Sequence, residues 1–202
     1  MVDFEINKHG ENHTCLISGK QVDFYLLSQT EALEKLEFLN FCSSLDSKYI
    51  ARFLKAERKR RTIIVRNMAR YLVAEKTKTS WRDWEICVDP SQTRKLIYGE
   101  GEEYFVSFSH SPNWYAVAVA KFSVGIDIEE VKIGRPWMQM VDFLTLDEVD
   151  QKPKTQLEFL NVWTQHEASI KATGADVKRM PLSIQHTSPD ANTICCVAIT
   201  EV

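Results

Sequence analysis

Two acidic side chains, Asp127 and Glu129, stand two residues apart in the segment VGIDIEEVK. Asp127 directly follows the apolar run WYAVAVAKFSVGI. In a β-strand, residues i and i+2 point to the same face, so the two carboxylates are predicted to lie side by side and to repel each other. A solvated strand end would tolerate that repulsion. A Mg²⁺ ion would remove it, because hard oxygen ligands on one face are what this cation binds. Gly125 would allow a close backbone approach at the same place.

A third acid, Glu167, lies in the helical segment NVWTQHEASIKATG. It follows Leu160 at i+7 and Trp163 at i+4, so it falls within or beside an apolar stripe that continues to Ile170. A charge in that position needs a partner, and Lys171 follows Glu167 at i+4 in the favourable order for an ion pair. An ordinary ion pair on a helix and a functional acid are both consistent with this pattern.

Polar and basic groups elsewhere could bind phosphate. The segment SFSHSPNW holds Ser109, His110 and Ser111 on a predicted turn, where they could bind phosphate oxygens or simply cap the turn. A basic cluster lies earlier in the chain, and its members are Arg52, Lys55, Arg58, Lys59, Arg60, Arg61, Arg66 and Arg70. A solvated helix face would explain the cluster, and a polyanionic partner is the alternative. Nucleic acid is the less favoured partner, since no aromatic interleaving or known reading motif accompanies the cluster.

The elements that must position these residues follow from the pattern of apolar residues. Strands are predicted within 4–27, near 86–88, over 114–120 and 124–128, and near 182–186 and 193–199, and helices over 30–42, within 47–75 and over 155–173. The short join at 121–123 predicts a hairpin between its two strands, and Gly99–Gly101 predicts a turn. Gly174 suits the position after the last helix. Each half mixes helix and sheet, so an α+β protein with two similar lobes is expected.

Composition sets the outer limits. The chain has 202 residues, 44% of them apolar, which is enough for one compact domain or two small lobes. A net charge of −3 disfavours a general nucleic-acid binder, and no apolar run reaches the roughly 18 residues of a membrane span. Residues 1–10 show no signal-peptide core. The cysteines are odd in number and lack CxxC spacing, which predicts reduced thiols in a cytoplasmic protein: Cys15, Cys42, Cys87, Cys195 and Cys196.

The order of motifs resembles the 4′-phosphopantetheinyl transferases of the Sfp type. The motifs are RF at 52–53, RT at 61–62, SHS at 109–111, VGIDIE at 124–129, FLTLDE at 143–148 and WTQHEASIKATG at 163–174. The resemblance covers roughly residues 52–174, and the GIDIE segment combined with W-x-x-x-E-A-x-x-K-x-x-G is its most specific part.

The resemblance implies a fold, an activity and partners. The fold would be α+β, a pseudo-twofold pair of similar lobes at 1–108 and 109–202, each a small antiparallel sheet packed with helices, in one compact unit. The activity would be Mg²⁺-dependent transfer of 4′-phosphopantetheine from coenzyme A to a serine of an acyl or peptidyl carrier protein, with release of adenosine 3′,5′-bisphosphate. Mn²⁺ is the alternative cation. A cytoplasmic monomer without nucleic-acid or membrane partners is expected.

The resemblance also assigns residues. The metal-binding acids fall on Asp127, Glu129 and Glu167, and the catalytic pair falls on Glu167 and Lys171. The end of coenzyme A that carries adenosine bisphosphate would be held by Arg61, Thr62, Lys95, Ser109 and His110.

The sequence departs from the family pattern in three places. The family's GKP-like segment is replaced by TRKLIYGE, where Lys95 stands at the matching distance from Ser109. His166 replaces the usual lysine before the metal-binding Glu, and residues 46–51 are less basic than is usual. A catalytically weak relative that binds coenzyme A or a carrier without efficient turnover is therefore the alternative function.

Overall fold

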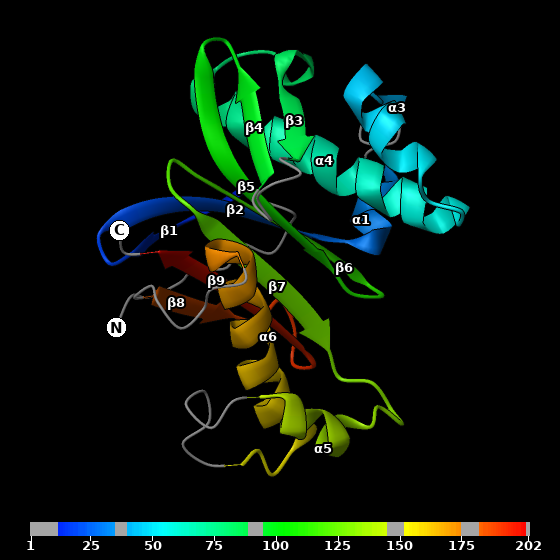
Figure 1. Ribbon diagram of the computed structural model, residues 1–202, viewed down its shortest axis with the longest axis vertical. Helices are drawn as coiled ribbons and strands as arrows, with labels where there is room; N and C mark the ends of the chain where they lie inside the picture. The colour runs from blue at the N-terminus through cyan, green and yellow to red at the C-terminus, as the bar shows by residue number, and fades with distance from the viewer. Residues whose placement is uncertain (1–11, 35–39, 89–94, 145–151, 175–181, 201–202) are drawn as a thin grey trace.

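The computed structural model describes residues 12–34, 40–88, 95–144, 152–174 and 182–200 (Figure 1). Within these ranges the strands form two antiparallel sheets. The larger sheet has the order β1-β2-β6-β5-β4-β3 and the smaller has the order β7-β9-β8. Helices cover the outer faces, so the chain is a mixed α+β protein, as predicted.

The larger sheet is built from β1 (Asn12–Ile17), β2 (Lys20–Ser28), β3 (Glu85–Val88), β4 (Lys95–Gly99), β5 (Glu102–His110) and β6 (Trp114–Ala120). The turn predicted at Gly99–Gly101 is confirmed: it joins β4 to β5, with positive φ at Glu100 (50°) and Gly101 (77°). Two such residues suit a tight hairpin turn. Strands β4 and β5 were not predicted as separate elements, because the pattern between 84 and 106 is mixed.

The smaller sheet consists of β7 (Val124–Glu130), β8 (Leu182–Thr187) and β9 (Thr193–Thr200). The hairpin predicted between the strands now labelled β6 and β7 is wrong. Strand β6 pairs with β2 and β5, whereas β7 pairs with β9. The free edge of β7 meets β5 instead, where the Ser107 and Ser109 hydroxyls accept the N–H groups of Ile126 (3.0 Å) and Ile128 (3.2 Å). The change of sheet thus lies at residues 121–123, and the expected lobe boundary at 108/109 falls inside β5.

The described helices are α1 (Gln29–Glu34), α3 (Ser44–Ala51), α4 (Ala56–Thr77), α5 (Trp137–Met140) and α6 (Gln156–Thr173), with single 3₁₀ turns at Trp81–Asp83 and Val141–Phe143. The helical region predicted within 47–75 is divided between α3 and α4. Ser43 and Asp46 form a capping box that begins α3. Of the helix predicted over 30–42, the structure describes α1 up to Glu34 and a helical Asn40, with residues 35–39 outside the described ranges, and Phe41 and Cys42 are not helical.

The sheets and helices form four layers (Figure 1). Alternate residues of β2 face opposite ways: Tyr25 and Leu27 pack with α4, whereas Phe24 and Leu26 pack with the smaller sheet. Helix α6 covers the other face of the smaller sheet. The order of layers is therefore α4, larger sheet, smaller sheet, α6.

Helix α6 lies unusually close to β7. A Cβ atom on Gly125 would stand 1.9 Å from the carbonyl oxygen of Ala168, so only glycine fits between the two backbones. This confirms the close approach predicted at Gly125. Thr155 caps the start of α6 by accepting the N–H of Glu158, and Gly174 follows its end with φ of 76°.

Two further expectations concern the chain as a whole. The cysteines are free, as predicted. No helix in the described ranges is long and apolar enough to cross a membrane.

Candidate functional site

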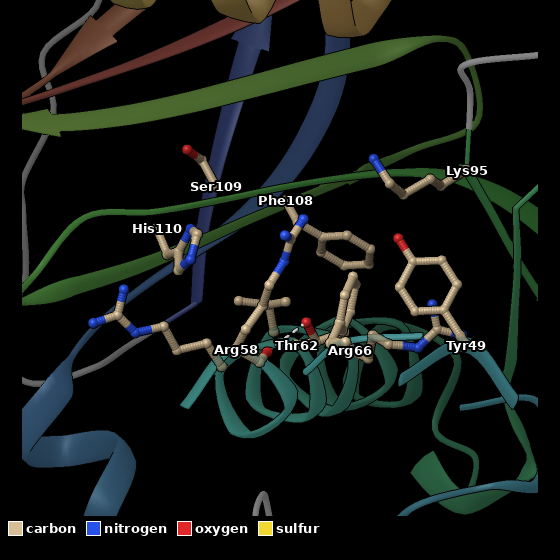
Figure 2. Close-up of a pocket in the computed structure, with 11 residues that line it drawn as sticks. Tyr49, Arg58, Thr62, Arg66, Lys95, Phe108, Ser109 and His110 are labelled. Carbon is tan, nitrogen blue, oxygen red and sulfur yellow. Dashed lines mark hydrogen bonds between the residues drawn. The ribbon is translucent and has the colours of Figure 1, made fainter. Parts of the chain in front are cut away.

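A pocket of about 280 Å³ lies between α4 and the ends of β4 and β5 (Figure 2). Helix α4 contributes residues spaced three or four apart on a single face, which are Arg58, Arg61, Thr62, Val65 and Arg66. The strands contribute Lys95, Phe108, Ser109 and His110, and Tyr49 and Phe53 complete the wall. All five residues predicted to hold adenosine bisphosphate line this one pocket: Arg61, Thr62, Lys95, Ser109 and His110.

The prediction that Ser109 and His110 lie on a turn is wrong. They are the last two residues of β5. The turn begins at Ser111, whose N–H donates to the carbonyl of Trp114. The Ser109 side chain connects the pocket to the neighbouring sheet, because its hydroxyl donates to Asp127 Oδ1 at 2.7 Å and accepts the N–H of Ile128. The strand position therefore gives Ser109 a fixed orientation that a loop would not.

The basic cluster is not a single solvated face. Arg66 and Arg70 are buried, with 2% and 0% of their side chains exposed, and both pair with the buried carboxylate of Asp46 in α3. Arg66 also donates to the carbonyl of Ile86 at 2.7 Å. These arginines hold α3 against α4 and β3. Arg66 also lines the pocket, but its charge is paired with Asp46. Arg58 and Arg61, in the first turns of α4, offer further charge to the pocket, and Arg61 shares its charge with Glu57.

Lys95 is the cation best placed to meet an anion in the pocket. Its ammonium group makes no hydrogen bond with the described residues and stands 5.7 Å from the centre of the Phe108 ring. Burial and, to a smaller extent, the positive charges of Lys171 and Arg66 together lower the pKa of Lys95 to about 8. An anionic ligand would relieve the repulsion among these three cations.

His110 experiences the same positive field. Although His110 is exposed as a residue, partial burial of its ring lowers its pKa below the usual value. The charges of Arg61, Lys171 and Arg58 act in the same direction and outweigh that of Asp127. The ring is thus kept neutral near pH 7 and can donate or accept one hydrogen bond.

Asp127 has one carboxylate oxygen paired and the other unpaired. Oδ1 accepts from Ser109 and from Lys171 Nζ at 2.7 Å, and Lys171 also donates to the carbonyl of Ile126 at 2.9 Å. Oδ2 is buried and has no hydrogen-bond partner among the described residues. The predicted ion pair between Glu167 and Lys171 is therefore wrong. The contact at Gly125 brings α6 so close to β7 that Lys171 reaches Asp127 instead.

Glu129 is paired with an arginine that the sequence analysis did not single out. Arg135 Nη2 lies 3.0 Å from Glu129 Oε2. The pKa of Glu129 is nevertheless raised, mainly by burial, with the negative charge of Asp127 contributing and Arg135 opposing. That contribution agrees with the repulsion predicted between the two acids. Arg135 carries no periodic signal. Its only sequence signal is a basic residue in the loop that directly follows the acids.

The third predicted acid is placed apart from these two. Glu167 is half-buried on α6 and makes no hydrogen bond or ion pair within the described part of the chain. Across the same ranges, no three His, Cys, Asp or Glu side chains gather as a metal-binding group. Glu148 of the FLTLDE segment lies outside the described residues. The unpaired, buried Oδ2 of Asp127 beside Glu129 is nevertheless the kind of oxygen donor that a hard cation requires.

Comparison with known proteins adds no family to this description. A scan against protein-family models and a search of curated proteins return no match for the chain. The chemistry of the site is inferred from its own residues.

Proposed function

We propose that this protein is a 4′-phosphopantetheinyl transferase, which moves phosphopantetheine from coenzyme A to a serine of an acyl or peptidyl carrier protein in a Mg²⁺-dependent reaction. One observation supports the proposal most strongly. The five residues that the motif resemblance assigns to the nucleotide come from α4, β4 and β5 and line a single pocket. Ser109 then links that pocket directly to Asp127, the first of the proposed metal-binding acids.

The chemistry of the pocket suits adenosine 3′,5′-bisphosphate. Arg58, Arg61 and Lys95 supply positive charge for phosphate groups, and His110 supplies a neutral ring nitrogen. Tyr49, Phe53 and Phe108 give the aromatic surface against which a base can pack. The remaining, phosphopantetheine part of coenzyme A would extend past Ser109 toward Asp127.

Asp127 and Glu129 would hold the cation, Mg²⁺ or alternatively Mn²⁺, with Glu167 as the proposed third ligand. When bound, the cation supplies positive charge that stabilises the negative charge of the phosphoryl group being transferred. Lys171 holds Asp127 in place through Oδ1 and leaves Oδ2 free.

In the proposed step, the carrier serine oxygen forms a bond to the phosphorus that bears the pantetheine. The bond from this phosphorus to the adenosine bisphosphate oxygen breaks, and that product leaves with the bonding electrons. Glu167 accepts the serine proton, directly or through water, because its carboxylate is not engaged by described residues. The cations of the pocket hold the leaving bisphosphate, so orientation and electrostatics carry most of the rate enhancement.

The repeated order of elements supports the pseudo-twofold part of the proposal. Two strands, helices and further strands follow one another in the first half, β1 to β5, and again in the second half, β6 to β9. Both halves would contribute to one site, since the pocket belongs to the first and the acids to the second. A single chain would thus suffice as the working unit.

A weakly catalytic relative that binds coenzyme A without efficient turnover is the second candidate. It is favoured by the ion pairs that Lys171 and Arg135 already make with Asp127 and Glu129, and by the separate position of Glu167. The measurement that decides is the mass of several apo carrier proteins after incubation with the protein, coenzyme A and Mg²⁺. A carrier that gains phosphopantetheine supports the transferase. Binding of coenzyme A with no modified carrier supports the second candidate, and no binding of coenzyme A contradicts both.

A further inference from the structure

We infer that Arg135 is a further phosphate-binding residue, which holds the phosphoryl group next to pantetheine in coenzyme A through Nη1 while Nη2 remains on Glu129. This inference rests on the proposed function. It concerns a residue outside the motifs of the resemblance, in the loop between β7 and α5.

The loop directs Arg135 back toward the acids of β7. The N–H of Arg135 donates to the carbonyl of Lys132 at 3.2 Å, and Gly134 has φ of 77°, which closes a tight turn. The Arg135 carbonyl accepts the N–H of Trp137 at 2.8 Å and so ties the turn to the start of α5. The guanidinium is therefore held by backbone geometry on one side and by Glu129 on the other.

One nitrogen of this guanidinium has no acceptor. Nη2 donates to Glu129, but Nη1 is buried and unpaired among the described residues. A buried donor on a charged group is costly to leave unpaired. The side chain is not sealed off, because 13% of it is exposed, as is 20% of Glu129 beside it.

An unpaired acceptor and an unpaired donor thus lie on either side of Glu129, on Asp127 and Arg135. Asp127 Oδ2 is an acceptor without a donor, and Arg135 Nη1 is a donor without an acceptor. A diphosphate carrying a divalent cation would satisfy both, because the cation meets the carboxylate and the phosphoryl oxygens meet the guanidinium. The planar, permanently charged guanidinium is well suited to hold a carboxylate and a phosphate at once.

Two of the other cations are already committed, and a third, Lys132, acts on Glu129 only as an exposed charge. Lys171 Nζ binds Asp127 Oδ1 and the carbonyl of Ile126, and Lys95 lies in the pocket proposed for adenosine bisphosphate. If Arg135 binds one phosphoryl group and the pocket binds adenosine bisphosphate, loss of Arg135 should change the affinities for two ligands differently. Coenzyme A carries the phosphoryl group assigned to Arg135, whereas adenosine 3′,5′-bisphosphate lacks it.

The test is calorimetric titration of the full-length protein with each of these two ligands in Mg²⁺ buffer. The proteins compared are wild type, Arg135→Ala, Arg135→Lys and Lys132→Ala, the last being an exposed cation of the same turn that serves as the matched control. Arg135→Ala is expected to weaken coenzyme A binding about tenfold or more while changing bisphosphate binding less than about twofold. Arg135→Lys, which cannot hold both anions side by side, should lose an intermediate amount, and Lys132→Ala should match wild type.

Unchanged bisphosphate binding also shows that the variants are folded around an intact pocket. The inference is overturned if Arg135→Ala and Arg135→Lys keep the wild-type ratio of the two affinities, or if Lys132→Ala lowers the ratio as much. Titrations repeated in excess chelator should show the same selective loss. A loss seen only with Mg²⁺ would overturn the direct contact and indicate a role through Glu129. If the wild type binds neither ligand, the proposed function fails and this inference with it.

Discussion

At the scale of single residues, the unpaired oxygen of Asp127 gives the first prediction. Asp127→Asn keeps the size of the side chain but removes the charge that a cation needs. We expect transfer to fall on the order of a hundredfold or more, since stabilisation of transition-state charge is usually the largest catalytic contribution. Carrier modification is the measurement, and exposed Asp142→Asn is the control. Full activity of the wild type in excess chelator would contradict the metal assignment.

The pKa of Lys95, about 8, gives a prediction for pH. The ammonium group is charged below this value and loses its proton as pH rises through it. Affinity for adenosine 3′,5′-bisphosphate should therefore decline above about pH 8, well before an ordinary lysine, with a pKa near 10.4, would titrate. Lys95→Arg stays charged over the whole range and should bind with little change. Dissociation constants measured from pH 7 to pH 9.5 compare the two, and parallel curves would show that Lys95 does not contact the ligand.

His166 and Glu167 are neighbours for which different effects are expected. Successive helix residues point about 100° apart, and the His166 ring lies 6.1 Å from that of Trp163. His166→Lys, which introduces the residue usual in the family that the motifs resemble, should stay within about tenfold of the wild-type rate. Glu167→Gln removes the proposed base and should cost on the order of a hundredfold. The measurement is the transfer rate of each variant at the same Mg²⁺ and coenzyme A concentrations. Equal losses in the two variants would require the role of Glu167 to be reassigned.

At the scale of elements, the contact between α6 and β7 depends on Gly125. Gly125→Ala would place a methyl group 1.9 Å from the Ala168 carbonyl oxygen, so α6 must shift away. We expect a loss of about 1–3 kcal/mol in the free energy of unfolding, together with weaker transfer because Lys171 is drawn away from Asp127. Gly101→Ala is the control: it has open space but φ of 77°, so it should cost about 1 kcal/mol without affecting transfer. Denaturant unfolding measures both, and a fully stable Gly125→Ala would contradict the close packing.

The same elements show what the sequence could and could not predict. The pattern of apolar residues located β6, β7, β8 and β9 to within two residues and α6 to within one, with Gly174 marking the end of α6. The prediction of a hairpin between β6 and β7 was wrong because a short connection does not specify which strands pair. The serine hydroxyls of β5 accept the N–H groups at the edge of β7 instead. Local spacing also predicted the wrong partner for Lys171. The partner of Lys171 depends on the distance between α6 and β7, and the residue spacing within a helix does not predict that distance.

Within the site, motif matching identified the residues that line the pocket but not those that orient them. The role of Asp46 arises from its contact with Arg66 twenty residues later, and that of Arg135 from a turn that returns it to Glu129, six residues earlier. A cluster of basic residues appears uniform in sequence. In the fold, burial and the ion pairs with Asp46 distinguish Arg66 and Arg70 from the other members of the cluster.

At the scale of the whole molecule, Asp46 fixes α3 and thereby one wall of the pocket. Burial acts to raise its pKa, but the hydrogen bonds and charges of Arg70 and Arg66 outweigh this effect, and the pKa is lowered. A lowered folded-state pKa stabilises the protein above the unfolded value near 3.9, and this contribution is lost as pH falls through the folded-state pKa.

Asp46→Asn should therefore destabilise the protein by about 3–5 kcal/mol at pH 7, because it leaves the buried guanidinium of Arg66 without a carboxylate and that of Arg70 with Glu85 alone, at 3.4 Å. Thermal or denaturant unfolding measures the change, with Asp142→Asn again as the control. The difference from wild type should begin to narrow as pH falls below about 4, where the carboxyl of the unfolded chain is protonated, and should narrow further as pH falls through the lowered folded-state pKa. A difference that is small at pH 7, or independent of pH, would show that the buried pair contributes little.

The serine hydroxyls that join β5 to β7 also provide a built-in reporter. The amide protons of Ile126 and Ile128 are held by Ser107 and Ser109 and not by a neighbouring strand's carbonyls. Their exchange with deuterated solvent therefore follows the separation of the two sheets, whereas exchange of the β7 amides facing β9 follows opening within one sheet. Because Ser109 also lines the pocket, a bound nucleotide should slow exchange at Ile126 and Ile128 in particular. Two protons in the interior would thus register occupancy of a site that neither residue touches.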